Sequence, residues 1–169
     1  MTTPVYLDNN ATTRCDEAVV EAMLPFFTEQ FGNPSSMHAF GARVGGAVKS
    51  ARAQLQALLG AEFDHEIVFT AGGTESDNMA ILSALEIDPA RDEIITSAVE
   101  HPAVLSLCGH LEKTRGIKVH VIPVDGQGLL DIAAYRAALS EKTAIVSIMW
   151  ANNETGTIFP VAELAELAK

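Results

Sequence analysis

The chain has few of the features that would assign it to several common classes of protein. Its 169 residues include two cysteines, Cys15 and Cys108, which form no CxxC pair and no metal-ligand spacing. We therefore expect neither a metal site nor a disulfide framework, and a reduced, cytoplasmic protein is the simplest interpretation. Residues 1–4 are polar and show no signal peptide, and no apolar run reaches the length needed to span a membrane.

Basic residues are also scarce. Lysine and arginine together number 11 against 22 aspartates and glutamates, which gives a formal net charge of −11. Such an excess disfavours nucleic acid or an anionic membrane as a partner. Hydrophobic residues make up 48% of the chain and charged residues 20%, so the composition predicts a folded domain with a core.

Strand and helix patterns alternate along most of the sequence. Short runs of strand-forming residues predict strands at residues 67–69, 92–97, 118–124 and 144–150. The alternation favours a mainly parallel sheet with helices on both faces. We expect the strand at 144–150 to be central because it is apolar on both faces, and the strand containing Pro123 to lie near an edge.

The first third of the chain predicts two helices. One begins at Asp16 or Thr13, and Pro25 is expected to kink or end it. Its apolar residues, expected to face inward, are Val19, Val20, Met23, Leu24 and Phe27. A second helix stops at Gly60, and its first turns contain Gly41, Gly45 and Gly46. Because three glycines weaken a helix, they indicate close packing at this point.

Residues 66–78 are the stretch around which the chain is organised. The apolar run 67–69 leads through Gly72 and Gly73 into a helix that opens with Thr74. A glycine turn that runs into a helix N-terminus presents unpaired N–H groups and the positive end of the helix dipole, which suits a phosphate. The alternative is a tight strand-to-helix turn that binds nothing.

Polar residues follow two further predicted strands. His101 comes directly before Pro102, at the start of a helix, and Asn153 belongs to the run NNETG at 152–156. The carboxyl ends of parallel strands meet at one edge of the sheet, where open α/β sheets bind ligands. A phosphate site, an aromatic base and an amide at one edge predict a phosphorylated, planar ligand. The alternative for His101 is a capping or packing role, and His120 is expected to be a solvent-facing strand residue.

Five motifs in this order resemble the cysteine desulfurases of the NifS/IscS type. They are YLDNNATT at 6–13, GNPSS at 32–36, FTAGGTESDN at 69–78, EH at 100–101 and NNETG at 152–156. These enzymes belong to the class V aminotransferase family of fold-type I pyridoxal phosphate enzymes. The resemblance implies that residues 16–169 form an incomplete N-terminal portion of the cofactor-binding large domain, with residues 1–15 as a segment at the active site.

The resemblance also implies residue roles. Gly73 and Thr74 match the turn that binds the phosphate of pyridoxal 5'-phosphate. His101 matches the histidine that stacks on the pyridine ring and takes part in proton transfer, and Asn153 matches the asparagine near the phenolic oxygen of the ring. The implied reaction converts L-cysteine to L-alanine and passes sulfur, as a protein persulfide, to an iron–sulfur scaffold or another acceptor. The family's enzymes are homodimers.

The sequence departs from the family pattern in what it lacks. None of the five lysines lies in the Ser-x-His-Lys motif that holds the cofactor covalently, and neither Cys15 nor Cys108 matches the nucleophile. The strand that carries the aspartate for the pyridine nitrogen is absent, as is the arginine for the substrate carboxylate. Family members are more than twice as long, so we expect an N-terminal part that is inactive alone. In their sheet, the strand matching Val68 does not neighbour the strand at Ile94.

Two further interpretations stay open from the sequence. One is another class V aminotransferase-like enzyme, of the selenocysteine lyase or kynureninase type. The other is a non-catalytic chain that binds pyridoxal phosphate or pairs with a full-length enzyme.

Overall fold

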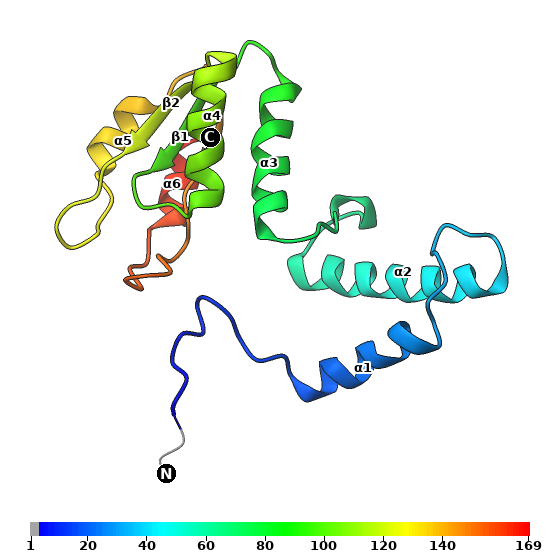
Figure 1. Ribbon diagram of the computed structural model, residues 1–169. Coiled ribbons are helices and arrows are strands. Elements are labelled where there is room, and N and C mark those ends of the chain that lie inside the picture. Colours follow the sequence, from blue (N-terminus) through cyan, green and yellow to red (C-terminus); the bar gives the residue numbers. More distant parts are fainter. Residues whose placement is uncertain (1–3) are drawn as a thin grey trace. The chain divides into compact units, whose positions relative to one another are not determined.

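The computed structural model describes residues 4–169, which form two compact units (Figure 1). One unit ends at Phe69 and the other runs from Thr70 to Lys169. Residues 1–3 lie outside the described residues. They belong to the polar N-terminal stretch in which the sequence shows no signal peptide. Across the described range, no helix has both the length and the apolar character needed to cross a membrane.

The first unit contains two helices and one short 3₁₀ turn, η1 (Asp64–Glu66). Helix α1 (Glu17–Thr28) begins after Asp16, whose carboxylate accepts the Ala18 N–H at 2.9 Å. Pro25 lies inside α1 and does not end it. The prediction that the apolar residues of α1 face inward is wrong for this unit: Phe27, for example, is 72% exposed. Helical periodicity identifies an apolar face but does not say what covers it.

The second helix, α2 (Ala39–Leu59), ends at Gly60, which adopts the left-handed conformation expected of a helix C-cap. The close packing predicted for its glycines is confirmed at Gly41 and Gly45. A Cβ on Gly41 would lie 2.3 Å from the Ser36 carbonyl oxygen, and one on Gly45 would lie 3.1 Å from that of Pro34. The loop at 32–36 therefore packs against the first turns of α2. At Gly46 a Cβ would meet nothing within 4 Å.

The strand predicted at 67–69 does not form. In the described part of the chain these residues pair with no strand, although they stay close to α2. Arg52 of α2 donates a hydrogen bond to the Ile67 carbonyl, and its guanidinium carbon lies 4.8 Å from the centroid of the Phe69 ring. A strand needs a partner to satisfy its backbone, and residues 67–69 have none here.

The second unit is a parallel sheet covered by helices. Its elements are α3 (Gly73–Ile87), β1 (Glu93–Ser97), α4 (Pro102–Arg115), β2 (Lys118–Ile122), α5 (Ile132–Ala138), β3 (Thr143–Ser147) and α6 (Val161–Leu167). The strand order is β2-β1-β3, and both pairings are parallel. The parallel sheet is as predicted, and β2 lies at an edge. The central position predicted for β3 is wrong, because β1 is central in this sheet. Apolar residues on both faces of a strand indicate that helices cover the sheet above and below it. They do not indicate that another strand lies on each side of it.

Two hydrophobic clusters lie on the two faces of this sheet. Ile94 packs with buried residues of α3 and α4, whereas Ile95 packs with buried residues of α5 and α6. Consecutive strand residues point to opposite faces, so β1 supplies a core residue to each layer. On the second face, Tyr135 of α5 is fully buried and its hydroxyl donates to the Leu164 carbonyl at 2.8 Å. The helices thus fix the sheet from both sides.

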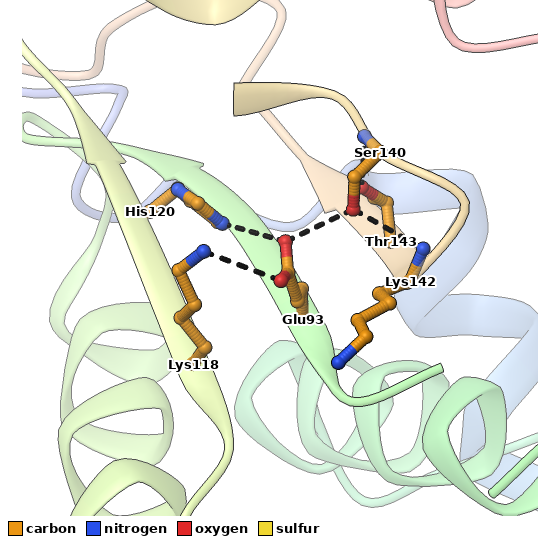
Figure 2. A network of polar contacts seen from close by, with 6 residues as sticks. All are labelled: Glu93, Lys118, His120, Ser140, Lys142 and Thr143. Carbon is orange, nitrogen blue, oxygen red and sulfur yellow. Dashed lines mark hydrogen bonds and ion pairs between the residues drawn. The ribbon is translucent and has the colours of Figure 1, made fainter. Parts of the chain in front are cut away.

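A polar network lies where β1 begins (Figure 2). Glu93 is 7% exposed, and its carboxylate lies 2.8 Å from His120 Nε2 and 3.2 Å from Lys118 Nζ, both on β2. Ser140, which comes shortly before β3, donates to the same carboxylate at 3.1 Å. His120 is therefore half-buried against Glu93, and the prediction of a solvent-facing residue is wrong. The pKa of Glu93 is lowered to about 2, mainly by the hydrogen bond from His120 and further by those from Lys118 and Ser140. Burial alone would raise this pKa.

We expect opposite effects from alanine at two glycines of α2. Gly41→Ala should destabilise the chain by about 1–3 kcal/mol, because the new methyl overlaps backbone atoms of the 32–36 loop. The matched control Gly46→Ala adds a methyl in open space and should stabilise the helix by up to about 1 kcal/mol. Urea denaturation followed by circular dichroism at 222 nm measures both. Equal effects at the two sites would contradict the packing described here.

The Glu93 network predicts acid-sensitive stability. The pKa of Glu93 is about 2 in the folded chain against an ordinary value of 4.5, so the unfolded chain takes up the proton first as pH falls. The stabilisation is complete above pH 4.5 and is lost between there and about pH 2. Glu93→Gln should therefore lower the urea midpoint at pH 6 and flatten its dependence on pH below 4.5, measured by the fluorescence of Trp150. Glu141 is exposed and follows Ser140 in the sequence. As the control, Glu141→Gln should keep the wild-type dependence of the urea midpoint on pH.

Candidate functional site

The connections of the second unit leave two adjacent strands in opposite directions at the carboxyl edge of its sheet. Strand β1 leads into α4 on one face, and its neighbour β3 leads into α6 on the opposite face. Adjacent parallel strands whose connections leave in opposite directions form a topological switch point, which is where open α/β sheets bind ligands. Residues that follow β1 and β3 therefore flank a ready-made site.

The start of α3 presents backbone donors. The first bond within the helix runs from the Ser76 N–H to the Gly72 carbonyl at 3.1 Å, and within residues 4–169 no acceptor pairs with the N–H of Gly73 or Thr74. The Glu75 carboxylate reaches back to the Ala71 N–H at 2.5 Å and holds the turn. These donors, together with the helix dipole, suit an anion.

Neither Gly72 nor Gly73 is required by the chain's own structure. Neither has a positive φ, and a Cβ on either would meet nothing within 4 Å. Glycine is therefore not needed at either position for the turn itself. The space beside both glycines is open in the described residues, and the phosphate site stays a prediction.

His101 is the N-cap of α4. Its Nδ1 accepts the Ala103 N–H at 3.1 Å, and Pro102 fills the first position of the helix. The capping alternative raised for this residue is therefore present in the structure. The cap uses Nδ1 only. The side chain is exposed, and in the part of the chain that the structure describes Nε2 has no partner. The cap orients the ring and leaves Nε2 exposed.

Two adjacent asparagines follow β3 and differ in role. Asn152 is 7% exposed and organises the loop: its Oδ1 accepts the N–H groups of Glu154 at 3.0 Å and Thr155 at 2.9 Å. Its Nδ2 donates to the Val99 carbonyl at 3.1 Å, which ties the loop to the segment after β1. Asn153 is exposed at the same edge, with its Nδ2 2.9 Å from the Glu154 carboxylate.

A second buried carboxylate, Glu100, lies between the ends of β1 and β3. One oxygen accepts the Ser97 hydroxyl and the Met149 N–H, each at 2.8 Å. Burial raises the pKa of Glu100, the two hydrogen bonds oppose that rise, and the Asp77 carboxylate of α3 adds to it. The pKa of the Cys108 thiol on α4 is also raised, mainly by burial and to a smaller extent by the Glu100 carboxylate.

The sequence therefore identified Gly73, Thr74, His101 and Asn153, which the structure places at the start of α3 and after β1 and β3. It did not single out Glu100 or Asn152 as the residues that hold this edge together. An Asn-Asn pair at a strand end is a signal for a side chain that bonds to its own backbone. A glutamate directly after a strand gives no such local signal.

The comparisons with known proteins identify the family of the chain. The model of the aminotransferase class V family matches residues 5–169. The chain belongs to this family. A cysteine desulfurase from Gluconacetobacter diazotrophicus is 77% identical over 164 residues, which are 97% of this chain and 41% of that protein. Among solved structures, a NifS-like protein matches 99% of the chain and 46% of its own with a TM-score of 0.92 and 39% identity.

A further solved structure, SspA in complex with cysteine, matches 96% of this chain and 47% of its own, with a TM-score of 0.86 and 34% identity. The fold is therefore that of the fold-type I cysteine desulfurases, as predicted. The chain spans less than half the length of these proteins.

The loop after β3 should depend on Asn152 far more than on Asn153. Asn152→Ala removes the acceptor of two backbone N–H groups and the tie to Val99, and we expect it to cost about 1–3 kcal/mol. Asn153→Ala, the matched control, should change the unfolding free energy by less than about 0.5 kcal/mol because the side chain is exposed. Urea denaturation followed by Trp150 fluorescence measures both. A larger loss for Asn153→Ala would reverse the two roles.

Proposed function

We propose that this chain forms the N-terminal, cofactor-binding part of a pyridoxal phosphate-dependent cysteine desulfurase. The reaction of the whole enzyme takes L-cysteine to L-alanine and transfers the sulfur, through a protein persulfide, to an iron–sulfur scaffold or another acceptor. The observation that carries the proposal is that His101 and Asn153 follow the adjacent strands β1 and β3 at one edge of the sheet, while the start of α3 keeps backbone donors without acceptors in the described residues. The relatives named cysteine desulfurase favour this activity over a selenocysteine lyase or a kynureninase.

The residues present fit pyridoxal 5'-phosphate. The N–H groups and dipole at the start of α3, with open space at Gly72 and Gly73, suit its phosphate, and the Thr74 hydroxyl adds a donor. The fixed ring of His101 offers a face for stacking on the pyridine and an Nε2 for proton transfer. Asn153 provides an amide for the phenolic oxygen. When bound, the cofactor supplies an electron sink for the substrate's α-carbon.

The lysines of the second unit lie away from these residues. Lys118 pairs with Glu93 where β1 begins, and Lys142 precedes β3, so both are at the amino edge of the sheet. Lys113 is in the last turn of α4, whose first residue follows His101, and Lys169 pairs with Glu166. Among the described residues of this unit no lysine reaches the switch point. We therefore propose that the chain binds the cofactor without a covalent bond and does not turn over cysteine.

We propose further features of the whole enzyme on the same basis. Residues 1–15 form a segment at the active site, and residues 16–169 are the incomplete large domain. The enzyme acts as a homodimer in the cytoplasm. Cys15 and Cys108 are not the nucleophile; for Cys108, burial and a raised pKa disfavour the reactive thiolate.

Titration of the 169-residue chain with pyridoxal phosphate, followed by absorbance, tests this function. We expect saturable binding, no label fixed on the chain by borohydride, and no alanine formed from cysteine. His101→Ala should weaken binding by about tenfold through loss of the stacking face, and His110→Ala, an exposed histidine on the same helix, should leave it unchanged. No saturable binding, or a lysine fixed by borohydride, would contradict the proposal.

A further inference from the structure

The buried carboxylate of Glu100 joins the two sides of the switch point through a single oxygen. Ser97, which donates its hydroxyl at 2.8 Å, is the last residue of β1, and Met149, which donates its N–H at 2.8 Å, follows the end of β3. The two donors are separated by more than fifty residues in sequence and belong to different strands. The carboxylate thus holds the strands together beyond their last ladder bonds.

The buried position of Glu100 is energetically unfavourable for a charged carboxylate. Glu100 is 7% exposed and has neutral donors, with Asp77 as the nearby charge, and burial raises its pKa. Burying such a group costs free energy that two hydrogen bonds offset in part, and an apolar side chain of the same volume would avoid that cost. What an apolar side chain would lose is the pair of directed bonds that set the two strand ends in register.

The residues that Glu100 holds continue directly into the site. His101 is the next residue, and its ring direction follows from the backbone at 100–103 because Nδ1 caps the Ala103 N–H. Met149 is followed closely by Asn152, whose side chain crosses back to the Val99 carbonyl at 3.1 Å. Glu100 to Met149 and Asn152 to Val99 are therefore two cross-links between the same two segments. Together they fix the distance between His101 and Asn153.

We propose that Glu100 is a positioning residue of the cofactor site, which acts through His101 and Asn153 by clamping the end of β1 to the end of β3. This rests on the function proposed above. Glu100 does not touch the cofactor in this scheme. Its effect is on affinity and geometry, and it is separable from its contribution to folding.

Strand β1 offers a matched control, because Glu93 at its other end is buried to the same 7% and accepts hydrogen bonds from both neighbouring segments. Glu100→Ala should raise the dissociation constant for pyridoxal phosphate by about tenfold or more, since misplaced groups lose most of their contribution. Glu100→Gln keeps an acceptor oxygen and should restore affinity to within about threefold. Glu93→Ala should lower the urea midpoint but leave the dissociation constant within about twofold of wild type.

Ser97→Ala, which removes one of the two donors with little change in volume, covers the case in which Glu100→Ala does not fold. It should raise the dissociation constant by about threefold, the effect of one lost hydrogen bond. If Glu93→Ala weakens binding as much as Glu100→Ala does for the same loss of stability, Glu100 is a structural residue and the proposal is wrong. Wild-type affinity in Ser97→Ala would also overturn it.

Nuclear magnetic resonance of the cofactor-free chain separates this proposal from the proposed function. Ser97→Ala and Glu100→Ala should shift the imidazole resonances of His101 and the side-chain amide of Asn153, whereas Glu93→Ala should not. If wild type binds no pyridoxal phosphate but these shifts occur, the function fails and the positioning role stands. If the shifts are absent, the positioning role fails whatever the affinity for the cofactor.

Discussion

The parallel pairing of β1 with both of its neighbours is the constraint on which the rest of the second unit depends. Parallel strands cannot be joined by hairpins, so every connection must cross a face of the sheet. The chain uses α4 on one face and α5 and α6 on the other, and Ile94 and Ile95 fill the two layers. Because those connections leave β1 and β3 in opposite directions, the carboxyl ends of the two strands are left uncovered between them. The site is a consequence of the topology before any side chain is considered.

A buried carboxylate lies near each end of β1, and the pKa values of the two are shifted in opposite directions. At the amino end, His120, Lys118 and Ser140 donate to Glu93 and lower its pKa. At the carboxyl end, Glu100 has neutral donors and a nearby Asp77, and its pKa is raised. The basic side chains Lys118 and His120 thus lie at the amino edge of the sheet. The start of α3 presents backbone donors without acceptors in the described residues and the positive end of the helix dipole.

Much of this fold could be predicted from the sequence because its signals are local. The alternation in β1, β2 and β3, the cap at Asp16 and the left-handed glycine after α2 depend on a few neighbouring residues each. What could not be predicted depends on partners. Residues 67–69 have the composition of a strand, yet they form none where no other strand pairs with them. The apolar sequence of β3 shows that layers cover its faces and says nothing of its position at an edge.

The same distinction applies within the site. Gly73, Thr74, His101 and Asn153 could be predicted because each lies at a strand end or a helix start, which the local pattern marks. Glu100 and Asn152 hold those residues in place through bonds to Met149 and Val99, and each bond joins positions about fifty residues apart. No single window of sequence contains both partners. The residues predicted to meet a ligand lie in recognisable motifs, whereas the buried residues that link the strand ends are defined by the folded sheet. A search for positioning residues in such a site should therefore begin with buried polar side chains that link the ends of adjacent strands.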